Sequence, residues 1–270
     1  MRLKDRIAIV VGAGQSPGEG IGNGRATALT FAREGAKVLC VDHHLASAQE
    51  TVDLIAAKGS TKGGTALAFK ADVTKNAEIA AMVAETIDRW GKIDILHNNV
   101  GVSLGGGDAE LLALTEEAFD RVVAINLKSC ILAAKHVIPI MRRQKSGAIV
   151  NISSMAAITT YPYVAYKATK SAMIAFTEQL AYQNAEYGIR ANVILPGLMD
   201  TPMAVETRAR EWGKSRAEVA AERDSKVPLR KKMGTAWDVA NAALFLASDE
   251  ASFITGVTLP VDGGASVRRG

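Results

Sequence analysis

The chain is poor in aromatic residues, cysteine and histidine, and each shortage excludes a class of protein. Aromatic residues make up only 5% of the 270 residues, so Ala, Val, Ile and Leu must form the core. Such a core suits a parallel sheet between two helical layers better than an aromatic-rich β-sandwich. The two cysteines, Cys40 and Cys130, lack CxxC spacing and indicate free buried thiols in a reducing compartment. The four histidines have no ligand-like spacing, so we expect no metal site.

Charge and apolar run length exclude two further classes. The formal net charge is +4, but 32 basic residues are interleaved with 28 acidic ones, and no basic stripe indicates nucleic-acid binding. No apolar run approaches the roughly 18 residues that span a bilayer. The first residues imitate a signal peptide, yet Asp5 interrupts their basic part and the apolar stretch Ile7–Val11 is too short. We therefore expect a cytoplasmic protein that binds neither nucleic acid nor membrane.

Strand-like and helix-like segments alternate along the whole chain. Short β-branched runs predict strands at Ile7–Val11, Lys37–Val41, Thr65–Lys70, Ile93–Asn98, Ala148–Ile152, Arg190–Leu195 and Thr258–Val261. Helical spacing predicts helices at Arg25–Glu34, Leu45–Lys58, Ala77–Trp90, Glu116–Arg142, Ala165–Tyr187 and Ala236–Ala247. Alternating units of this kind predict a single α/β domain, residues 1–270, with a Rossmann-type doubly wound parallel sheet of about seven strands and helices on both faces. The charge-rich stretch around residues 203–226 is predicted to be a helical substrate flap.

A glycine-rich turn follows the first predicted strand. Glycines let backbone amides approach a pyrophosphate, and the next helix N-terminus offers free N–H groups. The turn is about six residues longer than usual, and we expect the insertion, residues 15–20, to bulge outward near the adenosine side. Counting back from the helix makes Gly22 and Gly24 the late glycines, with Gly20-Ile21-Gly22 as the competing register. The candidate cofactor-binding residues of this turn are Gly12, Gly14, Gly22, Asn23 and Gly24.

Acidic residues end the second and third predicted strands. Asp42 can accept hydrogen bonds from the adenosine ribose and would repel a 2′-phosphate, which favours NAD over NADP. No Arg or Lys follows Asp42, but His43 and His44 do, and a charged histidine could tolerate a phosphate. Asp42 could alternatively only cap the next helix. At the end of the third strand, Asp72-Val73 could receive the adenine amino group.

A tyrosine and a lysine four residues apart carry the clearest chemical signal. Tyr166 and Lys170 lie on one face of a predicted helix. Alone, such a pair is common on solvated helices. A free tyrosine has a pKa of about 10, and a neighbouring ammonium with the positive nicotinamide ring would lower it. The pair therefore predicts a general acid/base with its own tuning group.

Two further polar residues can complete this group. Ser154 ends a predicted strand twelve positions before Tyr166, and its hydroxyl could hydrogen-bond the substrate oxygen. Ser153 is the alternative, and a strand-end serine is often only a turn former. Asn126 is a polar residue in an otherwise apolar predicted helix, where such residues also cap or kink.

Together these residues resemble the short-chain dehydrogenase/reductase family, over nearly the whole chain. Further matching pieces are Asn98-Asn99-Val100-Gly101, Pro196-Gly197, Thr201 and the tail Thr255-Gly256 with Val261-Asp262-Gly263-Gly264. The order of several motifs makes the match specific. Two residues depart from the family pattern: Val11 replaces a usual threonine, whose hydroxyl ties the turn to the Asn98-Asn99 region, and Val100 replaces a usual alanine.

The resemblance implies a division of labour at the catalytic end. Tyr166 would exchange the proton, and Lys170 would also hold the nicotinamide ribose. Ser154 would orient the substrate carbonyl or hydroxyl, and Asn126 would hold a water that links Lys170 to solvent. The reaction implied is hydride transfer between NAD(H) and a secondary alcohol or ketone.

The resemblance also implies cofactor contacts and an assembly. Asn99 and Gly101 would line the cofactor together with Pro196 and Gly197, and Thr201 would bind its pyrophosphate or carboxamide. The assembly implied is a homotetramer, with the Tyr166 helix in one interface and the C-terminal tail in another.

The family pattern turns mostly apolar residues toward the substrate. They suggest a ring-bearing or otherwise hydrophobic secondary alcohol, although several could simply pack the flap: Val102, Leu104, Met155, Tyr161, Leu198, Met199 and Trp212. The charges of the flap alternate in sign and indicate a solvated face, with Arg208, Arg210, Lys214 and Arg216 as its basic members.

Two other functions compete with the NAD-dependent dehydrogenase. An NADPH-dependent carbonyl reductase of the 3-oxoacyl type needs a basic residue near the turn. Arg25 is the only candidate, and its place inside a helix makes it a poor one. A non-catalytic dinucleotide-sensing protein would be expected to have a broken Tyr-x-x-x-Lys pair, whereas Tyr166 and Lys170 are both present.

Overall fold

A computed structural model describes residues 1–57 and 65–267 and contains one seven-stranded sheet. Its strand order is β3-β2-β1-β4-β5-β6-β9, and every pairing is parallel. The bounds are β1 (Ile7–Val11), β2 (Lys37–Asp42), β3 (Thr65–Lys70), β4 (Ile95–Asn98), β5 (Gly147–Ile152), β6 (Ile189–Pro196) and β9 (Thr258–Val261). The order reverses between β1 and β4, which is where such sheets place a dinucleotide. The predicted Rossmann-type fold is confirmed.

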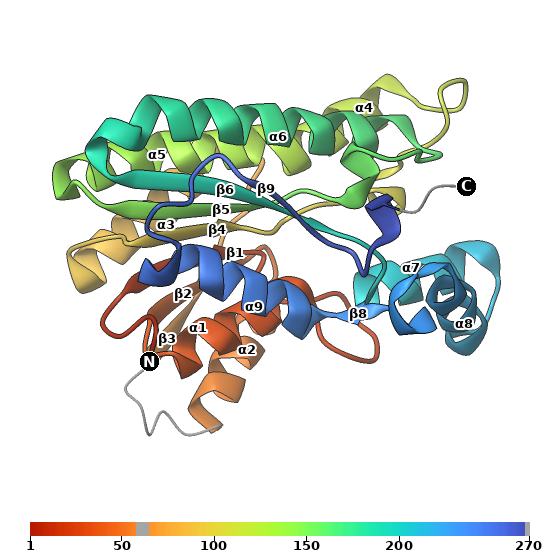
Figure 1. Cartoon of the computed structure of the whole chain (residues 1–270), viewed down its shortest axis with the longest axis horizontal. Coiled ribbons are helices and arrows are strands. Elements are labelled where there is room, and N and C mark those ends of the chain that lie inside the picture. The colour runs from red at the N-terminus through yellow and green to blue at the C-terminus, as the bar shows by residue number, and fades with distance from the viewer. Residues whose placement is uncertain (58–64, 268–270) are drawn as a thin grey trace.

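Helices cover both faces of the sheet (Figure 1). One layer contains α1 (Asn23–Arg33), α2 (Leu45–Ala57) and α9 (Ala236–Ala247). The other contains α3 (Asn76–Trp90), α5 (Ser129–Gln144) and α6 (Val164–Asn184). Strands buried on both faces need continuous apolar runs, and all five residues of β1 are buried. The last residue of the predicted helix Leu45–Lys58 lies outside the described residues.

The predicted helix Glu116–Arg142 is interrupted. It consists of α4 (Glu116–Val123), a π-helical segment (Ala124–Lys128) and α5. By length and composition alone this helix could cross a membrane. Its side chains Ala133, Ala134 and Val137 are instead buried against the sheet, as in a core helix. The π segment widens one turn at Asn126, and such segments often mark functional sites.

The region around residues 203–226 is helical, as predicted. It contains α7 (Pro202–Trp212) and α8 (Arg216–Lys226), which project beyond the carboxyl edge of the sheet (Figure 1). The short pair β7 (Met199–Asp200) and β8 (Gly234–Thr235) ties this flap to the domain. The flap has a small core of its own, formed by Val205, Ala209, Val219, Val227 and Met233. This small core is separate from the two main layers of the domain, and it sets the position of the flap.

Candidate active site

The structure brings Ser154, Tyr166 and Lys170 together where β5 ends against α6. The Ser154 hydroxyl hydrogen-bonds the Tyr166 phenol, and Lys170 Nζ lies 5.7 Å from the centroid of the Tyr166 ring. Lys170 Nζ donates to the Ile152 carbonyl oxygen at 2.8 Å. Ser153 is turned away: its hydroxyl is buried and donates to the Lys170 carbonyl oxygen at 2.7 Å. The geometry therefore favours Ser154 over Ser153.

The pKa of Tyr166 differs from the sequence-based expectation. Burial raises the pKa of Tyr166 to about 12, while the hydrogen bond from Ser154 acts in the opposite direction. Burial also lowers the pKa of Lys170 to about 8. In the protein alone desolvation dominates, and the lowering expected from the lysine together with the nicotinamide cation stays a prediction. The Lys170 ammonium points to a backbone carbonyl instead of the phenol.

Asn126 is fully buried beside the catalytic group. Its Oδ1 accepts from the Val102 N–H at 2.8 Å, and its Nδ2 donates to the Val102 carbonyl oxygen at 2.8 Å. Nδ2 also lies 3.2 Å from Thr169 Oγ1 on α6. Asn126 thus fixes the loop after β4 to the Tyr166 helix. The water-holding role implied by the family stays a prediction.

Asp108 is a positioning residue that the sequence analysis missed. It is 4% exposed, and its two carboxylate oxygens accept from the N–H groups of Ala165 and Tyr166, each at 2.9 Å. These are orphan donors at the start of α6, whose N-cap Tyr163 provides no side-chain cap. A carboxylate there satisfies the helix end and suits its dipole. No local signal could find this residue, because its partners lie 57 and 58 positions away.

The glycine-rich turn adopts the register that uses Gly22 and Gly24. Gly22 is the N-cap of α1. A Cβ added at Gly24 would lie 1.8 Å from the Gly12 carbonyl oxygen, and one at Gly14 would lie 2.7 Å from Asp42 Oδ2. Gly12 itself has φ +83°, and a Cβ there would meet Val100. Gly20 also needs to be glycine because its φ is +92°, but a Cβ there would meet only Arg216 Nη2, at 4.0 Å.

The inserted part of the turn lies on a different side from the one expected. Glu19 donates its N–H to Glu206 Oε1 of the flap at 3.3 Å. Arg216 of α8 lies 3.7 Å from Glu19 Oε2 and 3.1 Å from Glu206 Oε1. The expectation of a bulge near the adenosine side is therefore wrong for this tip, because opposite charges attach it to α7 and α8. Gln15, where the insertion begins, stays near α2 through Ser47.

Asp42 lies at the carboxyl end of β2, with a side chain 12% exposed. Its Oδ2 accepts from the Gly14 N–H at 3.1 Å and its Oδ1 from the His44 N–H at 3.0 Å. The carboxylate thus both supports the glycine turn and shapes the start of α2. Arg25 is 3% exposed, and its guanidinium is paired with Glu50 at 2.6 Å.

Asp72 and Val73 follow β3 with different exposure. Asp72 is half-exposed, and Thr74 donates both its N–H and its hydroxyl to Asp72 Oδ1. These hydrogen bonds, the hydroxyl's first, hold the pKa of Asp72 below its usual value. Val73 is 9% exposed and packs inward. Their contact with adenine stays a prediction.

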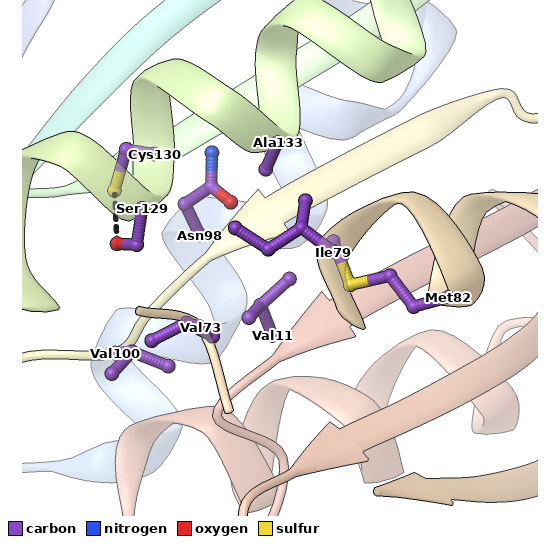
Figure 2. Close-up of a pocket in the computed structure, with 9 residues that line it drawn as sticks. All are labelled: Val11, Val73, Ile79, Met82, Asn98, Val100, Ser129, Cys130 and Ala133. Carbon is purple, nitrogen blue, oxygen red and sulfur yellow. Dashed lines mark hydrogen bonds between the residues drawn. The ribbon is translucent and has the colours of Figure 1, made fainter. Parts of the chain in front are cut away.

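The two departures from the family pattern lie in one apolar pocket (Figure 2). Val11 and Val100 line it together with Val73, and the side chains leave no room for a water molecule. The larger side chain at residue 100 is thus accommodated by apolar packing. The tie that a threonine would make at residue 11 is replaced: Asn99 donates its N–H to the Val11 carbonyl and its Nδ2 to the Gly12 carbonyl at 3.0 and 3.2 Å.

The remaining predicted cofactor residues lie at the same edge of the sheet. A Cβ at Gly101 would lie 3.0 Å from Lys170 Nζ, so this glycine permits the lysine to approach the loop. A Cβ at Gly197 would lie 2.7 Å from Asp262 Cα, which explains a glycine directly after Pro196. Thr201 is buried and caps α7 by accepting from the Ala204 N–H at 3.3 Å.

The predicted substrate residues divide into two groups. Tyr161 lies in the site, with its ring centroid 5.3 Å from that of Tyr166 and its hydroxyl 3.1 Å from Ser103 Oγ. Half-buried side chains at the same edge are Val102, Leu104 and Leu198. Met155 and Met199 are instead largely buried in the core, at 7% and 4% exposure. Trp212 is 41% exposed at the end of α7, with Lys214 over its ring.

The turn and its surroundings fit a dinucleotide. A Cβ at Gly12, Gly14 or Gly24 would meet neighbouring residues, so only glycine fits in this turn. The N-terminus of α1 has no side-chain cap, which leaves free N–H groups for a phosphate. Asn23 Oδ1 is buried without a hydrogen-bond partner at this same end. Within residues 1–57 and 65–267, no group of three His, Cys, Asp or Glu side chains could hold a metal ion.

Comparisons with known proteins agree with this geometry. The family model described as enoyl-(acyl carrier protein) reductase matches residues 17–266. The chain is 34% identical to 2-(R)-hydroxypropyl-CoM dehydrogenase of Xanthobacter autotrophicus, covering 96% of this chain and 97% of that protein. It is also 34% identical to the 3-oxoacyl-acyl-carrier-protein reductase of Thermotoga maritima, covering 98% and 99%.

A solved structure shows the same fold. A short-chain dehydrogenase/reductase from Burkholderia xenovorans superposes with a TM-score of 0.91 at 41% identity, covering 100% of this chain and 99% of that one. The match in sequence, fold and catalytic geometry spans the whole domain. This chain therefore belongs to the short-chain dehydrogenase/reductase family, and it is an NAD(P)-dependent oxidoreductase that acts on CH–OH groups.

Proposed function

We propose that this enzyme uses NAD(H), and not NADP(H), to interconvert a secondary alcohol and its ketone. Asp42 carries the proposal. Its carboxylate lies at the end of β2 beside the glycine turn, where a ribose hydroxyl can donate to it and a 2′-phosphate would be repelled. Arg25, the basic residue that follows the turn on α1, is buried and paired with Glu50.

The residues of this chain then have distinct tasks. When bound, the nicotinamide ring supplies the hydride acceptor or donor. The Tyr166 phenol exchanges a proton with the substrate oxygen, and the Ser154 hydroxyl donates to the same oxygen as charge develops on it. Lys170, held through Ile152, places a cation behind the phenol. Asn126 and Asp108 hold the loop and the helix that carry these groups.

The resemblance to a 3-oxoacyl-acyl-carrier-protein reductase supports a second candidate, an NADPH-dependent carbonyl reductase. That function requires a cation near the 2′-phosphate. His43 is exposed and its Nδ1 lies 3.1 Å from Asp42 Oδ1, so a protonated His43 could contribute one. The carboxylate beside it makes this arrangement less suited to NADPH than to NADH.

A fluorescence titration with NADH and NADPH tests the choice of cofactor. We expect NADH to bind at least tenfold more tightly, and Asp42→Ala to narrow that ratio as the repulsion is removed. Asp42→Asn keeps a side chain that can accept a hydrogen bond from the turn, so this variant isolates the effect of the negative charge on the cofactor ratio. Asp53→Ala, an exposed acidic residue on α2, is the control for net charge. An unchanged ratio in both Asp42 variants would place specificity elsewhere.

For the substrate we propose a hydrophobic or cyclic secondary alcohol. The half-buried apolar side chains of Val102, Leu104 and Leu198 lie at the edge where Tyr161 and Tyr166 meet, and they support an apolar substrate body. A screen of secondary alcohols with NAD at alkaline pH, followed by absorbance, measures this preference.

We also propose a homotetramer located in the cytoplasm. Exposed apolar side chains on α4, α5 and α6 support an assembly that uses the Tyr166 helix: Phe119, Ile131 and Tyr182. Analytical ultracentrifugation measures the oligomeric state directly. The free buried thiols of Cys40 and Cys130 suit a reducing compartment.

A further inference from the structure

Arg223 of α8 is buried without an acidic partner. It is 7% exposed, its Nε lies 3.3 Å from Met233 Sδ, and its Nη2 donates to the Met199 carbonyl oxygen at 3.4 Å. Among the residues that the structure describes, no carboxylate oxygen forms an ion pair with it. A thioether is a weak acceptor, and the carbonyl contact is long. Asp200, Glu222 and Asp224 act on its charge from beyond ion-pair distance, and a buried cation without a contacting anion is costly.

Arg208 of α7 is a second arginine of the flap that forms no ion pair with an acidic residue among those the structure describes. It is half-buried, and its one hydrogen bond goes to the Ala204 carbonyl of its own helix at 2.8 Å. No ion pair involves it within the described part of the chain. Since the flap is rich in acidic residues, two unpaired arginines on adjoining helices require an explanation.

The acidic residues of the flap are engaged by other cations. Arg216 forms ion pairs with both Asp200 and Glu206, at 2.7 and 3.1 Å. Lys232 takes Asp224 at 2.6 Å, and two lysines, Lys214 and Lys226, take Glu222. The expectation of a solvated face with alternating charge thus holds for the outer ion pairs. It is wrong for Arg208, which is half-buried; Arg223, which that expectation did not include, is buried as well.

The Arg223 guanidinium contacts Met199, next to the half-buried Leu198, and the charges of both arginines reach the tyrosines of the site. The positive charges of Arg208 and Arg223 repel one another. Arg223 also interacts electrostatically with the Tyr161 phenol, and Arg208 with the Tyr166 phenol. Burial, followed by the charge of Arg208, lowers the pKa of Arg223 to about 10, so both side chains are cationic at neutral pH. Tyr161 and Tyr166 are themselves in ring contact, with centroids 5.3 Å apart.

We infer that the substrate carries an anionic group, a carboxylate, sulfonate or phosphate, which Arg208 and Arg223 bind while the alcohol carbon faces Tyr166. A planar guanidinium suits such groups because it donates two parallel hydrogen bonds to them. The anion supplies the partner that Arg223 lacks, and the apolar body of the substrate lies between the flap and the tyrosines. This inference rests on the proposed function, since it names the substrate class of the same site.

Matched alcohols test the inference on the wild-type enzyme with NAD. The probes are 3-hydroxybutanoate, 5-hydroxyhexanoate and 4-hydroxycyclohexanecarboxylate, each compared with its methyl ester. Because a charge-assisted contact contributes more than a neutral one, at least one acid should exceed its ester in kcat/KM by about tenfold. Esters that are turned over as well as every acid would overturn the inference and leave the proposed function intact.

A binding measurement makes the test independent of turnover. Cyclohexanecarboxylate, ethanesulfonate and phenyl phosphate are titrated into the enzyme with NADH, with cyclohexanecarboxamide as the neutral analogue, and nicotinamide fluorescence is followed. We expect at least one anion to bind and the amide to bind about tenfold more weakly or not at all. Normal NADH binding without any anion binding contradicts the inference alone. Failure to bind NADH contradicts the proposed function.

Arginine variants locate the anion. Arg208→Met and Arg223→Met should each reduce the acid-to-ester ratio toward one, and Arg208→Lys should retain part of it. Arg210→Met, an exposed arginine of the same helix, is the matched control and should keep the wild-type ratio. If Arg223→Met disturbs the flap, the half-buried Arg208 still carries the test. A ratio that survives in Arg208→Met contradicts the assignment.

Discussion

The catalytic edge of the sheet and the flap hold their polar groups in different ways. At the catalytic edge, Asn126, Asp108 and Lys170 are buried and each is bound to backbone groups of another segment. In the flap, ion pairs form the outer surface, and Arg208 and Arg223 are left without acidic partners. A buried network whose hydrogen-bonding groups are all paired holds one geometry, whereas cations without a contacting anion can bind an anionic ligand. We therefore propose that the first region sets the reaction and that the second determines which substrate is bound.

The inserted part of the glycine turn connects these two regions. Its tip reaches Glu206 and Arg216, while its ends hold Ser47 and the start of α1. The glycine-rich turn and the flap are thus in contact through the inserted residues, which a turn of the usual, shorter length does not have. Three variants test how far the two regions are independent.

Tyr166→Phe has the largest expected effect. Loss of the phenol removes the proton donor and acceptor, so turnover should fall by about 10²- to 10⁴-fold. NADH affinity should stay close to that of the wild type, because the hydroxyl bonds Ser154 and not the glycine turn. Absorbance kinetics and a fluorescence titration measure the two quantities separately. Near-normal turnover would remove Tyr166 from the chemistry.

Lys170→Met is expected to stabilise the fold while it impairs catalysis. The folded protein releases the Lys170 proton near pH 8, whereas the unfolded chain keeps it until about pH 10.5. At pH 7 the buried ammonium therefore costs stability, on the order of 3 kcal/mol, and the variant should unfold at higher denaturant concentration.

The pH dependence of the free energy of unfolding shows whether the Lys170 ammonium stabilises or destabilises the fold. Between about pH 8 and pH 10.5 the unfolded chain binds more protons at Lys170 than the folded one, so wild-type stability should rise relative to the variant. Urea unfolding at several pH values measures the difference. A gap that stays constant across this window would show that the lysine is not buried as a cation.

Arg216→Met has the smallest expected effect on stability. Its ion pairs are partly exposed, so the loss should be below about 1 kcal/mol. Amide hydrogen exchange should nevertheless become faster in both residues 15–22 and the flap, since the link through Glu19 and Glu206 is removed. Arg210→Met is again the control. Faster exchange in the flap alone would mean that the turn is held by its own contacts.

Local patterns in the sequence were sufficient to predict the fold and to single out Ser154, Tyr166 and Lys170, which the structure brings together. The apolar run Ile7–Val11 predicts a strand at the bounds observed, because buried parallel strands need continuous apolar residues. Thr65–Lys70 is also a strand at the predicted bounds, although it is only partly buried. A helix places residues four apart on one face, so the spacing of Tyr166 and Lys170 already defines their common side. Glycine cradles are equally local, since their cause is backbone contact within one turn.

Only the tertiary structure decided which groups are satisfied and which are not. The caps that Asp108 provides for α6, the contact of Glu19 with Arg216, and the lack of a partner for Arg223 all depend on segments far apart in the chain. The pKa values of Tyr166 and Lys170 likewise follow from burial, which no spacing reveals. Residue type and periodicity determine what each segment can do locally, while desolvation and long-range pairing arise only once the segments are packed.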